Sequence, residues 1–216
     1  MVSQDVASEP DEPHRSARKR KAVLDAATEV FLKNSYLGTN MDEIATLSGV
    51  SKQTIYKYFA SKEALFVEIV GGMTNAAGDV VHKDQPMYDE QGQLTDYLEE
   101  YAYRQLATVL KPRIMQLRRL VIGEVHRFPE LAKVLYERGP QRAMTMLAGI
   151  FARLAERGLL VIDDPMVAAS HFNWLVMSAP LNQAMLLGDG AIPKPAELRR
   201  HAKDGVRVFL AAYGGH

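Results

Sequence analysis

The sequence predicts an all-α protein in which a small three-helix N-terminal domain precedes a larger helical domain. Apolar residues recur at spacings of three and four along nearly the whole chain, which is typical of helices with one buried face. Alternating strand patterns are missing, since residues 159–162 are the only candidate and are too short to build a sheet. The 216 residues are 47% hydrophobic and 24% charged, as expected for a folded chain with a sizeable core.

Four short helices are predicted in the first third of the chain. A helix starts near residue 18 and should end at Asn34-Ser35, because Asn can adopt the left-handed conformation. Thr39 and Asn40 are candidate N-caps for a helix over 41–47, with acidic residues three positions on in a plausible capping box. Ser48-Gly49-Val50 forms a tight turn, Ser51 caps a helix over 52–58, and Ser61 caps a fourth helix.

Longer helices are predicted in the rest of the chain. One starts near Leu94, and prolines, which suit a first helical turn, open the following ones at Pro112, Pro129, Pro165 and Pro195. Gly139-Pro140 should bend or split the helix that begins at Pro129. The last two helices are expected over roughly 165–187 and 195–213. Pro180 should kink the first of these, because it frees a carbonyl one turn earlier.

Charge divides the chain into three parts. Residues 1–14 are predicted to be a disordered tail, whose first 13 residues carry four acids and no base. Residues 15–62 form a basic domain, and residues 63–216 form a larger, nearly neutral one. A basic unit joined to a neutral one suggests two tasks, with polyanion binding a candidate for one of them. The alternative is a solvated basic surface, and charge alone does not decide between the two.

Several classes of protein are excluded or disfavoured by composition. The chain has no Cys, which removes disulfides and thiolate metal sites and fits a reducing cytoplasm. The charge-free run 165–188 nears the length of a membrane span, but polar residues crowd its middle, so a buried helix and no membrane contact are expected. The six His show no zinc-protease spacing, and no phosphate or dinucleotide glycine motif occurs. We therefore expect no enzyme, no metal site and no cofactor.

The paired short helices around Gly49 have the features of a helix-turn-helix motif. Ala45 allows close approach of the helices, Gly49 permits the turn, and Val50 and Ile55 wedge the helices together. The second helix can then enter a DNA major groove, where its side chains read base edges while lysines and tyrosines contact phosphates. Two plainer interpretations stay open: the pair could be an ordinary helical corner, and its tyrosines and lysines could be core and surface residues.

The residues 18–66 closely resemble the DNA-binding domain of the TetR family of bacterial transcriptional regulators. The resemblance is carried by the intact run GVSKQTIYKYFASKEAL at Gly49–Leu65. It implies a homodimeric repressor that a small molecule releases from a palindromic double-stranded DNA operator. Together, helix and resemblance assign DNA contacts to Thr39, Asn40, Lys52, Gln53, Thr54, Tyr56, Lys57, Tyr58 and Lys62. Where the family usually has Gly, this chain has Ser35, so Asn34 or Ser35 must end its helix at some strain.

The region 112–190 is similar to the AefR-like subgroup of TetR C-terminal domains, through RRLVIGE at Arg118–Glu124 and the later FPEL and YERGP. In this larger domain, Met and aromatic residues could line an apolar cavity for a small apolar or aromatic effector. The alternative is that they only pack the bundle. The candidate ligand-binding residues are Tyr103, Met115, His126, Met144, Phe151, Phe172, Trp174 and Met177.

The last two helices are the expected homodimer interface. A stripe of Leu198, Ala202, Val206, Phe209 and Tyr213 lies along one of them, and the other has more apolar surface than one neighbour can cover. We therefore predict a cytoplasmic DNA-binding repressor that an effector releases. The alternative is a DNA-binding regulator without a small-molecule effector, controlled by a protein partner.

Overall fold

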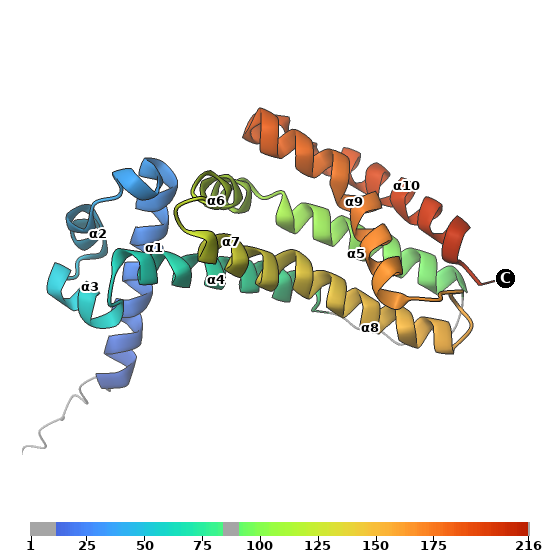
Figure 1. Ribbon diagram of the computed structural model, residues 1–216, viewed down its shortest axis with the longest axis horizontal. Coiled ribbons are helices and arrows are strands. Elements are labelled where there is room, and N and C mark those ends of the chain that lie inside the picture. The colour runs from blue at the N-terminus through green and yellow to red at the C-terminus, as the bar shows by residue number, and fades with distance from the viewer. Residues whose placement is uncertain (1–11, 84–90, 216) are drawn as a thin grey trace, which may run out of the picture. The chain divides into compact units, whose positions relative to one another are not determined.

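The computed structural model describes residues 12–83 and 91–215, and the chain is helical throughout these ranges apart from its connections (Figure 1). The predicted tail lies outside them except for residues 12–14, which begin the first helix. The described elements are α1 (Glu12–Gly38), α2 (Met41–Ser48), α3 (Lys52–Tyr58), α4 (Lys62–Val81), α5 (Gln91–Val109), α6 (Pro112–Gly123), α7 (Pro129–Tyr136), the π-helix η1 (Glu137–Gln141), α8 (Arg142–Glu156), α9 (Pro165–Leu187), the 3₁₀-helix η2 (Asp189–Ala191) and α10 (Pro195–Tyr213).

The all-α prediction is confirmed. The described residues contain no strand, and their only β-type pairing is an isolated bridge between Leu160 and Gly214. Leu160 belongs to the segment that the sequence offered as a strand candidate. The bridge ties the chain that follows α8 to the end of α10.

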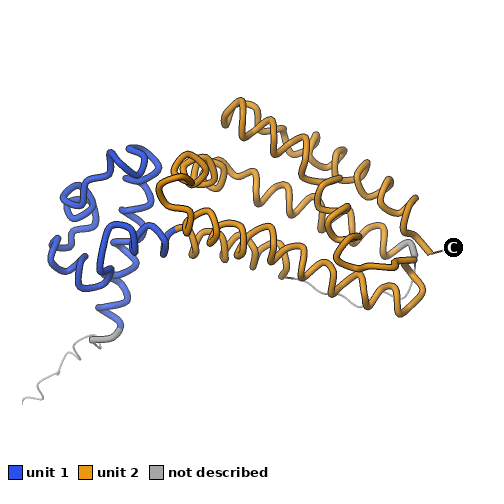
Figure 2. The backbone as a smooth tube through the Cα atoms, in the orientation of Figure 1, with its two compact units in different colours: residues 1–69 blue, residues 70–216 orange. Residues whose placement is uncertain are grey.

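The chain forms two compact units, residues 1–69 and 70–216 (Figure 2). The division falls inside α4, whereas the boundary predicted from the sequence lies between Lys62 and Glu63. The difference arises because Leu65, Phe66 and Ile69 are buried with the N-terminal helices. In Figure 2 the two units are coloured separately, and each is described by itself below.

The first unit is held by an aromatic cluster where α1 ends. Ser35 has φ 59 and ψ 176, a conformation that turns the chain and breaks the regular course of α1. This confirms that the Asn34-Ser35 pair ends the regular helix with a residue at positive φ. Beyond the turn, the Tyr36 ring lies 5.3 Å from that of Phe66, which stacks on Phe31 at 4.7 Å.

The second unit is a bundle of helices around one apolar core. The largest fully buried side chains come from α5, α8, α9 and α10 and include Tyr101, Phe151, Phe172 and Phe209. The Phe209 ring stacks on Phe151 at 5.0 Å and meets Phe172 edge to face at 5.2 Å. These three rings tie α8, α9 and α10 together.

Two prolines shape this bundle. Pro140 lies in η1, the π-helical segment between α7 and α8, so the predicted interruption at Gly139-Pro140 is confirmed. Pro180 lies inside α9, and having no N–H it leaves the carbonyl of Val176 without its helical donor. The Nε2 atom of His201 on α10 lies 2.8 Å from that carbonyl oxygen. The Val176 carbonyl freed by Pro180 thus takes part in a hydrogen bond that joins α9 to α10.

Among the described helices, α4 is the one that is long and apolar enough to cross a membrane by length and composition alone. Its Leu65, Phe66, Ile69 and Val70 are buried inside the protein. The helix therefore has the character of a core helix. The charge-free run at 165–188, whose length is near that of a membrane span, contains α9 and contributes Phe172 and Val176 to the core.

Candidate nucleic-acid interface and internal cavity

Helices α2 and α3 form a helix-turn-helix as predicted. Gly49 adopts the left-handed conformation with φ 65, and the Val50 N–H donates to the carbonyl of Ala45 at 3.2 Å. Ile44 on α2 and Ile55 on α3 are both fully buried. Ser51 caps α3 by accepting a hydrogen bond from the Thr54 N–H at 3.2 Å. The turn and its cap fix α3 with one face buried and the other outward.

The outward face of α3 carries several of the predicted DNA-contacting side chains. Lys52, Gln53, Tyr56 and Lys57 are exposed, and Tyr56 is 42% exposed although it is aromatic. Thr54 is partly buried, and its hydroxyl lies 2.8 Å from that of Ser51. The plainer interpretation of Tyr56 as a core tyrosine therefore does not hold in this fold.

Three of the predicted contact residues also interact with other side chains or backbone groups of the first unit. The Lys52 ammonium lies 3.0 Å from the Asp42 carboxylate on α2, which raises the pKa of Lys52 through that hydrogen bond and the nearby charge. The Tyr58 hydroxyl lies 3.1 Å from that of Ser16 on α1. The Lys62 ammonium donates to the Thr39 carbonyl at 2.7 Å and lies 4.8 Å from the centre of the Tyr36 ring.

The two residues offered as N-caps of α2 have different roles. Asn40 is the cap, because its side chain accepts from the Asp42 N–H at 2.9 Å, and it is exposed. Thr39 is only 5% exposed, and its hydroxyl donates to the Ser35 carbonyl at 2.7 Å. Glu43 accepts from the Asn34 side-chain amide at 2.8 Å, so it is engaged with α1.

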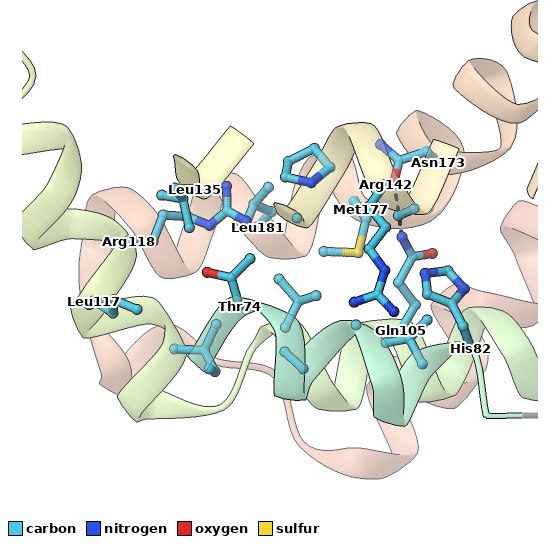
Figure 3. Close-up of a pocket in the computed structure, with 18 of the residues that line it drawn as sticks. Thr74, His82, Gln105, Leu117, Arg118, Leu135, Arg142, Asn173, Met177 and Leu181 are labelled. Carbon is cyan, nitrogen blue, oxygen red and sulfur yellow. Dashed lines mark hydrogen bonds between the residues drawn. The ribbon is translucent and has the colours of Figure 1, made fainter. Parts of the chain in front are cut away.

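The second unit contains a partly open cavity of about 110 Å³ (Figure 3). Residues of α4, α5, α6, α7, η1, α8 and α9 contribute to its wall. Most of the wall is apolar, as for the majority of small-molecule sites. The polar lining residues are Thr74, His82, Gln105, Arg118, Arg142 and Asn173.

Gln105 and His82 form the polar part of the wall at one end of the view in Figure 3. Gln105 is 3% exposed and donates through Nε2 to Oδ1 of Asn173 at 2.9 Å. Burial, together with the charges of Arg142 and Arg104, lowers the pKa of His82 to about 4. The imidazole is therefore neutral at pH 7, and its Nδ1 lies 3.2 Å from the Tyr101 hydroxyl.

Two arginines reach the cavity. Arg142 on α8 lies across Gly78 of α4, where a Cβ atom would come within 3.0 Å of its guanidinium. The same guanidinium donates to the Asp79 carboxylate at 2.6 Å. Arg118 on α6 lies at the other end of the view, near Leu135 and Leu181 (Figure 3). Burial lowers the pKa of Arg118.

Two of the eight predicted ligand residues, Trp174 and Met177, are part of the cavity wall. Phe151 and Phe172 belong to the aromatic core, Met115 is fully buried there, and Tyr103 packs under the Arg199 guanidinium at 3.7 Å. Met144 is partly buried outside the wall, and His126 is exposed between α6 and α7. The structure thus does not bring these eight side chains together around one space.

Sequence reasoning missed most of the polar cavity residues. Asn173 lies in the wall, whereas His171 on the same helix lies outside it, with its Nδ1 2.5 Å from the Tyr213 hydroxyl. Arg118 and Arg142 resemble other surface arginines in the sequence. The one local signal is Gly78, whose missing side chain leaves room for Arg142.

The apolar residues of α9 and α10 divide between core and surface. The α10 stripe predicted as an interface is buried within its own subunit, since Leu198, Ala202, Val206 and Phe209 are all 5% exposed or less. That stripe is therefore not available to a partner. The exposed large apolar side chains of these helices are Met166, Val167, Trp174, Leu186 and Leu187 on α9 and Val208 on α10.

Comparison with known proteins agrees with this architecture. Residues 23–69 match the family described as bacterial regulatory proteins, tetR family. Residues 96–215, more than half of the chain, match the AefR-like transcriptional repressor C-terminal domain.

Solved structures match over nearly the whole chain. A TetR-family transcriptional regulator from Mesorhizobium loti is 38% identical with a TM-score of 0.85, covering 93% of this chain and 98% of that one. The flavonoid-responsive regulator FrrA is 32% identical with a TM-score of 0.74, covering 92% and 98%.

A curated relative matches over a shorter region. The transcriptional regulator RutR of Escherichia coli K12 is 44% identical over 52 residues, which are 24% of this chain and 24% of RutR. The match thus spans about a quarter of the length of that relative. Taken together with the helix-turn-helix geometry, the two family matches and the full-length structural likeness show that this chain belongs to the TetR family of transcriptional regulators, with an AefR-like C-terminal domain.

Proposed function

We propose that the protein is a cytoplasmic repressor that binds a palindromic DNA operator as a homodimer and is released when a small apolar or aromatic effector enters the cavity of its second unit. The observation that carries the DNA-binding part is the outward face of α3. Gln53, Tyr56 and Lys57 are exposed there, while Ile55 on the opposite face is fully buried. This arrangement suits a helix that inserts into the major groove.

Within that face, the residues are expected to divide between reading bases and contacting phosphates. Gln53 near the start of α3 is exposed and is the best candidate for a base contact, since an amide can bond the edge of adenine at two points. Lys57 and Tyr56 suit phosphate oxygens. The Thr54 hydroxyl already bonds that of Ser51, so it can contact a base only from that position. Thr39 is buried, so we assign it a structural role in the first unit and no direct contact with DNA.

Dimerisation is supported by the surface of α9. Five large apolar side chains of this helix are 45% exposed or more, and Leu186 and Leu187 reach 81% and 73%. Exposed apolar surface of this kind marks an interaction site. A twofold dimer would pair α9 with α9 and with α10 and would present two copies of α3, which must lie about 34–36 Å apart to meet successive major grooves.

Release by an effector is supported by the cavity and its connection to the first unit. Thr74, Gly78 and Val81 of α4 line the cavity, and the same helix begins at Lys62 in the DNA-binding unit. An effector can weaken DNA binding only by preferring the arrangement that does not fit the operator. The family description as a repressor and the naming of FrrA as flavonoid-responsive favour repression and an aromatic effector.

The DNA-binding part is tested by selecting duplexes from a random pool and measuring variants on the selected site. We expect a palindrome, and Gln53→Ala should relax the preference at one position of each half-site by about 1–3 kcal/mol. Lys83→Ala, which removes an exposed charge from the second unit, is the matched control. An unchanged preference in Gln53→Ala, or selection of duplexes without common sequence, would refute the proposed docking.

A further inference from the structure

We infer that the cavity takes an apolar, weakly acidic ligand whose anionic oxygen bonds Arg118 and whose hydrogen-bond donor reaches Oε1 of Gln105 at the other end. This inference rests on the proposed effector function and specifies the chemistry of the effector. Figure 3 shows the two residues toward opposite ends of the cavity, with Thr74 drawn between them.

The first supporting feature is the unpaired oxygen of Gln105. Its Nε2 is held by Asn173 at 2.9 Å, which fixes the plane and direction of the amide. Its Oε1 is buried and has no hydrogen-bond partner among the described residues. Buried acceptors are nearly always paired in folded proteins, and leaving one unpaired is costly. An oxygen held in this way in a cavity wall is suited to accept a hydrogen bond from a ligand hydroxyl.

The second feature is the guanidinium of Arg118. Its Nε is buried and, within the described part of the chain, has no hydrogen-bond partner. The adjacent Arg119 differs, because it donates to the Asp189 carboxylate and to the Ala184 carbonyl at 2.8 Å. An arginine stays charged even in a buried position, and a desolvated charge requires an anion. A carboxylate or phenolate would supply it, with the two-point geometry that arginine favours for carboxylates.

The third feature is the charge of the whole lining. Its described residues include Arg118 and Arg142 and neither Asp nor Glu. Arg142 is neutralised by Asp79 at 2.6 Å, so Arg118 remains as the positive centre. The rest of the wall combines the uncharged polar residues described above with apolar ones such as Ile114, Leu135 and Leu181. This combination favours an apolar body with one acidic end and disfavours cationic ligands.

The test uses matched probes and the fluorescence of Trp174, the only Trp of the chain and part of the cavity wall. The probes are 4-hydroxycinnamate, its methyl ester and 4-methoxycinnamate, titrated into the full-length protein together with a panel of neutral apolar compounds. We expect the acid to bind at least about tenfold more tightly than the ester. Capping the hydroxyl should weaken binding several-fold.

Variants locate the two contacts. In Arg118→Gln the acid and the ester should bind alike, whereas Arg113→Gln, an exposed arginine of the same helix, should keep the preference. In Gln105→Met the hydroxy and methoxy probes should bind alike. A second readout needs no ligand: Arg118→Met should raise the melting temperature of the free protein, because it removes a desolvated guanidinium whose Nε has no partner among the described residues.

The outcomes separate the two levels of the proposal. If neutral compounds bind and the acid has no advantage, the acidic-ligand inference is wrong and the cavity remains an effector site. If no compound of either kind binds, the inference and the effector function both fail. A lowered melting temperature in Arg118→Met would also count against the inference, since it would show that Arg118 is a structural residue.

Discussion

Lys57 and Lys62 carry the same charge on neighbouring helices, but their surroundings differ. Lys57 is exposed at the end of α3. Lys62 begins α4 and donates to the Thr39 carbonyl at 2.7 Å, with the Tyr36 ring beneath it. An exposed lysine can give its full charge to a phosphate, whereas Lys62 also joins α4 to the segment before α2. The two lysines therefore give different predictions.

Replacing Lys57 with Ala should weaken binding to all DNA sequences about equally and should reduce the slope of log affinity against log salt concentration by about one unit. The stability of the free protein should not change. Lys62→Ala should also reduce the slope, but it should lower the free energy of unfolding by about 1 kcal/mol through the lost hydrogen bond. Titrations at several salt concentrations and urea unfolding measure both effects, and unchanged slopes in both variants would contradict the proposed docking.

His82 makes the stability of the second unit depend on pH. Burial and nearby arginines hold the pKa of His82 at about 4, below its ordinary value of 6.5. The unfolded chain therefore binds a proton at this residue before the folded protein does, so stability is full above pH 6.5 and falls as the pH drops toward 4. The hydrogen bond to Tyr101 depends on the same neutral ring if the phenol is the donor.

The predicted consequence is a loss of stability between pH 7 and pH 5 that His82→Gln does not share. The difference should be on the order of 1 kcal/mol, a value reduced to allow for partial solvent screening. Urea unfolding of the unaltered protein and of His82→Gln at pH 7 and pH 5 measures this difference. The contributions of the other histidines are the same in both proteins and cancel when the two are compared. Equal pH dependence in the two proteins would show that His82 is not held neutral by the fold.

Residue roles could be predicted from the sequence where they depend on local geometry. The turn at Gly49, the caps at Ser51 and Ser61 and the exposed face of α3 follow from spacing and residue type. The polar cavity residues on other helices could not be predicted in this way, because Gln105, Arg118 and Arg142 come from three helices that meet only in the folded bundle. Large Met and aromatic residues marked the core instead, as Phe151 and Phe172 show.

At the scale of the helix, the end of α1 combines an unfavourable conformation with favourable packing. Ser35 has φ 59 and ψ 176, a region that a side chain disfavours and that costs about 1–3 kcal/mol. The turn is retained because it places Tyr36 beside Phe66 and offers the Ser35 carbonyl to Thr39. Glycine would adopt this conformation without a Cβ penalty.

Ser35→Gly should therefore raise the free energy of unfolding by about 1 kcal/mol, with no loss of DNA affinity. The matched control is Glu29→Gly, an exposed position in the regular part of α1, where the same residue should destabilise the helix by a similar amount. Thermal or urea unfolding provides the measurement. A destabilised Ser35→Gly variant would contradict the strained conformation of this turn.

The boundaries of the last helices were predictable, but the face each one buries was not. Prolines opened α9 and α10 at the expected residues, Pro165 and Pro195. The stripe of α10 was assigned to a dimer partner, yet it packs into the core of its own subunit. Periodicity shows that one face of a helix is buried, but it does not show whether the same subunit or a partner covers that face. His201, which bonds the carbonyl freed by Pro180, illustrates the same limit.

At the scale of the whole molecule, the proposed DNA-reading unit and the proposed effector-binding unit share the helix α4. The structural likeness to TetR-family proteins covers nearly the whole chain, which supports the same division of tasks. We propose that the exposed apolar side chains of α9 pair two copies of the chain. In the proposed mechanism, reading a palindrome depends on the distance between two α3 helices, and the effector acts by changing that distance.

The most direct test is the affinity of the protein for its selected palindrome before and after about five base pairs, half a helical turn, are inserted between the half-sites. We predict that the insertion lowers affinity at least about a hundredfold, because one dimer can no longer place both α3 helices in grooves on the same side of the duplex. A dimer-disrupting variant, Leu186→Glu with Leu187→Glu, should bind both duplexes weakly and alike. Unchanged affinity of the unaltered protein for the lengthened site would contradict the account.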